Sequence, residues 1–114
     1  MDAISATLMI KVLDGLSARA VATAGNVANA GTPNYHPVRV TFEEALKAAA
    51  GQGSAAVRAF QPTIGPEIRA DLGQGLRLDL ELATASSTAG RYAALVEVLN
   101  RQLQIDGLAV SGNK

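Results

Sequence analysis

This chain of 114 residues carries ten Lys and Arg against ten Asp and Glu, so its formal net charge is zero, which disfavours binding to nucleic acid or to an anionic membrane surface. It contains no Cys and a single His, which excludes disulfide bonds and cysteine-based zinc sites. Its length predicts one domain spanning residues 1–114.

The first predicted element is a long helix from about Ile4 to Ala30, within an N-terminal segment 1–31. Apolar and small residues recur in it at alternating spacings of four and three, as in a helix that packs on another helix. The larger residues predicted to pack are Met9, Leu13, Leu16 and Val27. A second row holds only short side chains: Ala18, Ala22, Gly25 and Asn29. This row either faces solvent or, because its side chains are small, allows the backbone of a neighbouring subunit to approach closely.

The segment 32–78 is predicted to contain a turn, a short helix and a loop, because all four prolines and five of the eleven glycines lie in it. Three apolar residues alternate with polar neighbours and indicate a short strand: Val38, Val40 and Phe42. A helical turn is predicted over 42–50. The stretch 51–75 is predicted to be loop, and a loop of this length is either functional or disordered.

The last predicted element is a second long helix, from about Leu80 to Leu108, in a C-terminal segment 79–110. The residues predicted to pack on the first helix are Tyr92, Val96, Leu99 and Leu103. The sequence from Asp106 onward, which includes Gly107, is expected to break this helix. The predicted fold is therefore all-α, with two long helices packed as an antiparallel coiled coil and joined by an extended, irregular middle segment.

The sequence offers no recognised catalytic or ligand-binding constellation. His36 stands alone in a turn-rich segment, and the adjacent Glu43 and Glu44 diverge by about 100° on a helix instead of converging on one proton. We therefore predict no enzymatic activity, no catalytic residue, no cofactor, no metal and no small-molecule substrate. No apolar run approaches the roughly 20 residues of a membrane-spanning helix. The start of the chain lacks the basic region of a cleaved secretory signal.

The stretch between the first helix and the strand resembles the N-terminal signature of bacterial flagellar rod proteins. That family typically reads Asn-x-Ala-Asn-x-x-Thr-Pro-Gly-Tyr after a long helix. The matching residues are Asn26, Ala28, Asn29, Thr32, Pro33 and Tyr35. Asn34 stands where Gly is usual, and because Asn tolerates a positive φ, the type II turn is expected to survive.

The C-terminal helix adds to this resemblance. Its segments 78–81, 91–95 and 99–103 look like the C-terminal half of a proximal rod subunit, and the chain is short, as those subunits are. The resemblance fits two kinds of proximal rod subunit, and both stay open as alternatives for this chain. The likeness covers about residues 1–46 and 78–114 and leaves the middle of the chain unassigned.

The resemblance implies a structural subunit of the flagellar basal body, exported uncleaved by the flagellar type III apparatus and assembled helically in the periplasmic rod to transmit torque for motility. The implied partners are other copies of the chain, FlgC-like rod subunits, the FliE adaptor, the membrane ring and the export gate. Phe42 and Leu46 resemble the segment that rod substrates present to the gate, although residues four apart on a helix also simply bury one face. The alternative function is a helical adaptor or export chaperone outside any filament.

Overall fold

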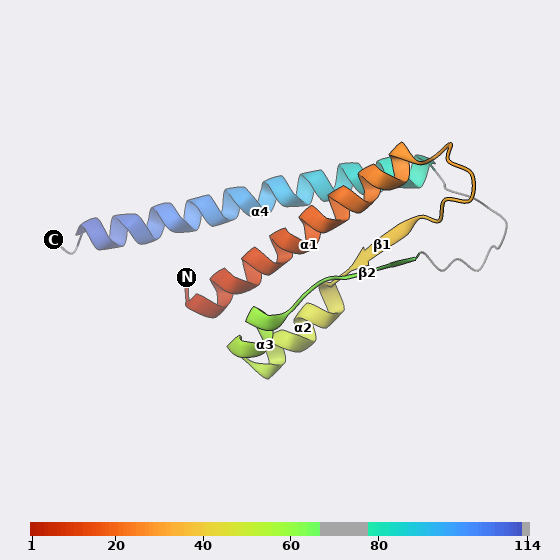
Figure 1. Ribbon diagram of the computed structural model, residues 1–114. Helices are drawn as coiled ribbons and strands as arrows, with labels where there is room; N and C mark the ends of the chain where they lie inside the picture. The colour runs from red at the N-terminus through yellow and green to blue at the C-terminus, as the bar shows by residue number, and fades with distance from the viewer. Residues whose placement is uncertain (67–77, 113–114) are drawn as a thin grey trace.

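The computed structural model describes residues 1–66 and 78–112, and these form an elongated molecule of 64 × 28 × 17 Å (Figure 1). Its two longest elements, α1 (Ala3–Ala28) and α4 (Leu78–Gly112), lie side by side. The Met1 ammonium is 3.4 Å from the Asp106 carboxylate at one end of this pair, while Asn26 bonds to Glu81 at the other. The two helices are therefore antiparallel, as predicted.

The ends of α1 are set by side chains that bond to the backbone. Asp2 accepts a hydrogen bond of 2.7 Å from the Ser5 N–H, and this bond lowers the pKa of the Asp2 carboxyl. At the other end, the Asn29 N–H and the Asn29 Nδ2 donate to the Gly25 carbonyl at 3.0 and 2.8 Å. The predicted N-terminal helix is therefore present, with both of its ends capped.

The middle of the chain forms a compact unit against α1. Strand β1 (Val38–Thr41) pairs with β2 (Thr63–Pro66) in an antiparallel two-stranded sheet, with Val38 opposite Pro66. Two helices connect the strands, α2 (Glu43–Gln52) and α3 (Ser54–Ala59), and Gly53 joins them with a φ of 112° that favours glycine. The predicted strand and the predicted short helix are thus both found.

The loop predicted over 51–75 is wrong for the part of it that the structure describes, because α3 and β2 lie there. Val57 of α3 is fully buried in the core, although the residues around it are mostly Ala and Gly. Residues 67–75 of the predicted loop lie outside the described residues.

The core lies between α1 and the unit formed by β1, α2 and α3. Its buried apolar residues are Leu16, Val40, Phe42, Leu46, Ala49 and Val57. Ala18 and Ala22 of the small-residue row pack against this core, so the row is covered in part by the chain's own middle segment. The prediction that this row is solvated or faces a neighbouring subunit is therefore wrong for these two alanines.

Gly15 permits the closest approach in this core. A Cβ atom at Gly15 would lie 2.5 Å from Cδ1 of the Phe42 ring, well inside van der Waals contact. Because Phe42 is itself buried, its ring has no free space into which to move. The close packing of α1 on the middle unit therefore depends on the absence of a side chain at Gly15.

The contact of α4 with α1 includes polar residues that were not predicted to pack. Glu81 and Thr88 are buried, and Glu81 accepts a hydrogen bond from Asn26 of α1. Of the predicted packing residues, Leu16, Val27 and Tyr92 line a groove between the two helices, and Tyr92 is 41% exposed. The others are half-buried, apart from Leu103, which is 57% exposed: Met9, Leu13, Val96 and Leu99. Packing of the two helices as a coiled coil stays a prediction.

One further prediction needs correction. Helix α4 continues through Gly107 to Gly112, since a single interior glycine costs only about 1 kcal/mol relative to alanine and does not by itself end a helix. The described fold is mostly helical, as predicted, with a small two-stranded sheet in addition.

Candidate functional site

Asn26 is the centre of a buried polar cluster that joins α1 to the rest of the chain. Its Oδ1 accepts hydrogen bonds from the Tyr35 hydroxyl at 2.7 Å and from the Val38 N–H at 3.0 Å. Its Nδ2 donates to the Val38 carbonyl at 3.0 Å and to Oε2 of Glu81 at 3.1 Å. The carboxamide therefore bonds the edge of β1 that faces away from β2, as a neighbouring strand would.

Glu81 supplies the contact of α4 with this cluster. Its carboxylate is fully buried and accepts from Asn26 and from the guanidinium of Arg39 on β1. A buried carboxylate is tolerated only when it is paired and hydrogen-bonded, and both conditions are met here. Sequence analysis assigned Glu81 no role in a site, although Glu81 lies in the segment 78–81 that adds to the resemblance.

The remaining motif residues form the turn that follows α1. The Thr32 hydroxyl donates to Oδ1 of Asn29 at 3.1 Å, and the Tyr35 N–H donates to the Thr32 carbonyl at 3.3 Å. Asn34 has a φ of 63°, which confirms the positive φ predicted after Pro33. This turn directs the Tyr35 hydroxyl back to Asn26.

Two members of the motif, Ala28 and Pro33, have no polar side chain and so donate and accept no side-chain hydrogen bond in this turn. Ala28 is the last residue of α1, and Pro33 occupies the exposed second position of the turn. The structure therefore brings the four polar members of the motif together in one bonded series: Asn26, Asn29, Thr32 and Tyr35.

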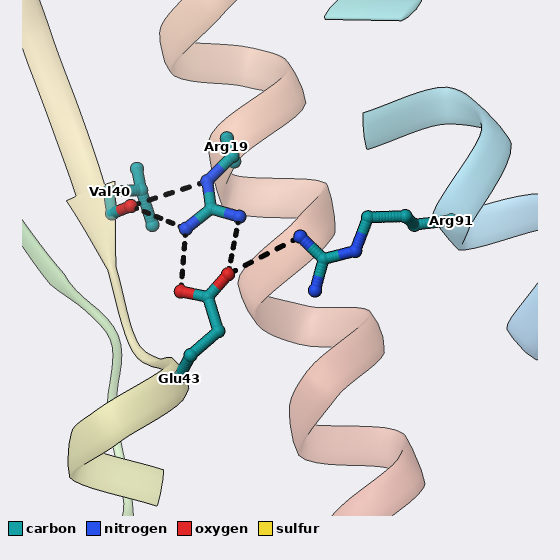
Figure 2. A network of polar contacts seen from close by, with 4 residues as sticks. All are labelled: Arg19, Val40, Glu43 and Arg91. Atoms are coloured by element: carbon teal, nitrogen blue, oxygen red, sulfur yellow. Dashed lines mark hydrogen bonds and ion pairs between the residues drawn. The ribbon is translucent and has the colours of Figure 1, made fainter. Parts of the chain in front are cut away.

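A second polar network links four elements at the surface of the core (Figure 2). Arg19 of α1 pairs with both carboxylate oxygens of Glu43 at 2.8 Å and also donates to the Val40 carbonyl at 2.9 Å. Its guanidinium carbon lies 4.8 Å from the centre of the Phe42 ring. Arg91 of α4 reaches the same Glu43 carboxylate at 3.4 Å. The network therefore fixes the start of α2 against α1 and α4.

The Arg19 hydrogen bonds to Glu43 lower the pKa of the Glu43 carboxyl from 4.5 to about 2. Because the folded pKa is the lower one, the stabilisation is complete above about pH 4.5 and is lost as the pH falls toward about 2. We expect the difference in unfolding free energy between the wild type and Glu43→Gln to shrink over this window. The Glu43 side chain is 44% exposed, so solvent screening keeps the effect modest.

Chemical denaturation at several pH values measures this difference. Glu44→Gln is the matched control, because Glu44 is the adjacent acid on α2 and is not a partner of Arg19. A wild-type advantage over Glu43→Gln that stayed constant between pH 5 and about pH 2 would contradict the assignment.

The other residues that sequence analysis considered have no side-chain hydrogen bond in either network. His36 is exposed in the turn-rich segment, and Glu44 is exposed on α2. Phe42 and Leu46 are both buried in the core, so apolar packing accounts for them in the folded chain. Their presentation to an export gate would require the unfolded chain and stays a prediction.

Within 1–66 and 78–112, no three His, Asp or Glu side chains gather in a way that could hold a metal ion. None of the helices in the described part of the chain is both long enough and apolar enough to span a membrane.

A groove runs between α1 and α4, with a volume of about 700 Å³. Its α1 wall includes Ala20, Ala24 and Val27, and its α4 wall includes Leu82 and Tyr92. Hydroxyl groups are the only polar side-chain groups among the described residues that line it. The groove is therefore suited to an apolar partner surface.

The fold and these contacts define an elongated, mostly helical module in which the polar motif residues join helices, turn and sheet. The chain matches no protein-family model and no curated protein sequence.

Proposed function

We propose that this chain is a FlgB-like structural subunit of the flagellar proximal rod, exported by the flagellar type III apparatus and assembled helically with its neighbours to transmit torque. In this proposal, its terminal helices pack as a coiled coil that neighbouring subunits complete. One observation supports this proposal above all: α4 has apolar side chains that the single chain leaves exposed. They include Leu82, Tyr92 and Leu103, and the first two line the groove between α4 and α1.

The polar cluster around Asn26 supports the resemblance on which the proposal rests. Two of its residues, Asn26 and Tyr35, match the rod signature, and their bonds connect the end of α1 with the turn and with the start of β1. A signature made of Asn, Thr, Pro and Tyr thus has a physical reason in this chain. A subunit that transmits torque needs such a fixed connection between its long helices and the rest of its fold.

The partners of the proposal come from the resemblance alone. They are further copies of the chain, FlgC-like rod subunits, the FliE adaptor, the membrane ring and the export gate, and the place of assembly is the periplasmic rod of the basal body. An elongated shape and an uncharged groove are compatible with lateral packing of subunits in a tube.

The alternative function is a helical adaptor or export chaperone that is never part of a filament. It would use the same exposed apolar side chains of α4 to bind a client. It has no evident need for the bonded turn between Asn29 and Tyr35, which is why we favour the rod subunit.

Mass spectrometry of purified basal bodies from the source cell tests the proposal directly. We expect this chain at a few copies per motor when it is quantified against the hook and ring proteins of the same preparation. A strain without the chain should be non-motile and should regain motility with the wild-type sequence. If basal bodies contain other rod proteins in abundance and none of this chain, the rod proposal is wrong. That result would favour the alternative function of an adaptor or export chaperone.

A further inference from the structure

Leu16 belongs both to the core and to the groove between α1 and α4, but the other residues of α1 that line the groove are not core residues. The residues of α1 that line it include Ala20 and Ala24, whereas the residues of α1 that pack against the middle unit include Val12 and Ala18. No charged side chain lines the groove among the described residues. An uncharged surface of this kind remains open on an otherwise folded chain.

The α4 wall of the groove belongs to a longer row of apolar residues. The row alternates spacings of four and three and contains Leu78, Leu82, Ala85, Ala89, Tyr92, Val96, Leu99 and Leu103. This alternation is the pattern of a seam against another helix. Within the chain, α1 covers only one side of the row, since Leu82, Tyr92 and Leu103 remain exposed. The missing contact is therefore with a helix.

The C-terminal part of α4 has an apolar, uncharged surface that matches the groove. The contact of Met1 with Asp106 places the start of α1 beside Asp106, so α4 continues past α1 (Figure 1). Over 98–108, α4 has one Arg and one Asp, which cancel in charge. Val98, Ile105 and Leu108 are exposed, and Leu108 is 72% exposed. This end of α4 is apolar and neutral, as the groove is.

We propose that the 98–108 part of α4 from a second copy of this chain occupies the groove between α1 and α4. The contact joins two different surfaces, so each pair of copies keeps one free groove and one free helix end. Such a heterologous contact leads to open-ended assembly instead of a closed dimer. The inference rests on the proposed function in that it names the surface by which copies would pack in the rod.

Two single substitutions separate the two surfaces. Ala24→Glu places a carboxylate in the groove and leaves the helix end intact, whereas Leu108→Glu does the reverse. Both positions are exposed, so the fold is retained and circular dichroism verifies it. Each variant should associate with itself roughly 30-fold or more weakly than the wild type, because a charge would be desolvated at the contact. Ala20→Glu is a second groove variant with the same expected result.

The matched controls place the same charge on exposed positions elsewhere. Ala45→Glu on α2 controls for the groove variants, and Ile64→Glu on β2 controls for Leu108→Glu. Both control variants should associate as the wild type does.

Sedimentation measurements over a range of concentrations give the decisive result. The average mass of the wild type should rise with concentration without a plateau at two chains. Ala24→Glu and Leu108→Glu should each remain at the 11.7 kDa of one chain, and their equimolar mixture should form a complex of twice that mass. The mixture forms this complex because one intact groove meets one intact helix end.

Three outcomes would overturn the inference: a wild type that stays a single chain, a wild type that closes at two copies, or a mixture of variants that forms no complex. These outcomes are distinguishable from a failure of the proposed function. If the chain is present in basal bodies but the variants do not complement each other, only the groove contact is wrong. If they complement each other but basal bodies lack the chain, only the rod assignment is wrong.

Discussion

Replacing Glu81 by Ala is expected to lower the free energy of unfolding by about 3 kcal/mol. The substitution leaves Nδ2 of Asn26 without one of its two acceptors and leaves the Arg39 guanidinium without its buried carboxylate. Because Arg39 is partly exposed, its guanidinium regains some hydration in the variant. The expected loss of unfolding free energy is therefore near the lower end of the range for broken buried ion pairs. Denaturant unfolding followed by circular dichroism measures the change.

Glu97→Ala is the matched control, since it makes the same substitution on the same helix. Glu97 is exposed and lies 3.7 Å from Arg101 one turn along, so its loss should change the unfolding free energy by less than about 0.5 kcal/mol. The loss of unfolding free energy in Glu81→Gln should lie between the losses in these two variants. An amide oxygen can still accept a hydrogen bond from Asn26, whereas the ion pair with Arg39 is lost. Equal losses in Glu81→Ala and Glu97→Ala would show that the buried cluster does not hold α4.

Local rules account for the parts of the fold that sequence patterns predicted. The spacing of apolar residues marks α1 and α4, and the alternation of Val38 and Val40 with polar neighbours marks β1. The positive φ of Asn34 follows from its place after Pro33 in a turn. Each of these features depends on residues within a few positions of one another.

The polar residues that α4 buries against α1 could not be derived in the same way. Glu81, Thr88 and Tyr92 lie on one side of this helix, because they are seven and then four positions apart. Periodicity favours the apolar Tyr92 for packing, yet the structure buries Glu81 and Thr88 and leaves Tyr92 41% exposed. The deciding contact joins Asn26 to Glu81, which is 55 positions away in the sequence. A partner at that separation leaves no local pattern.

The middle unit was missed in part for a related reason. Helix α3 is only six residues long, and β2 is bounded by prolines, so neither has a strong pattern of its own. Val57 belongs to a core that also contains Leu16 of α1 and Leu46 of α2, which are distant from it in the sequence. The groove was likewise visible in the sequence only as a seam, because how much of that seam α1 covers depends on how the two helices pack.

Replacing Gly15 by Ala is expected to destabilise the chain by about 2 kcal/mol, even though alanine is the better helix former by about 1 kcal/mol. The new Cβ would lie 2.5 Å from Cδ1 and 2.6 Å from Cγ of the Phe42 ring. Phe42 is held on its other side by the core that contains Leu46 and Val57, so relief of the clash requires α1 and the middle unit to separate. Thermal or denaturant unfolding at neutral pH measures the loss.

Gly90→Ala provides the matched comparison, because Gly90 also lies inside a long helix but the added Cβ would meet nothing within 4 Å apart from its neighbours and the nearby backbone of its own helix. This variant should gain up to about 1 kcal/mol from helix propensity alone. The two identical substitutions are thus expected to have opposite signs, which separates the packing effect at Gly15 from any general effect of removing a helical glycine. If both variants were stabilised, the close approach of the Phe42 ring to α1 would be disproved, and with it the packing of the middle unit that positions Arg19 against Glu43.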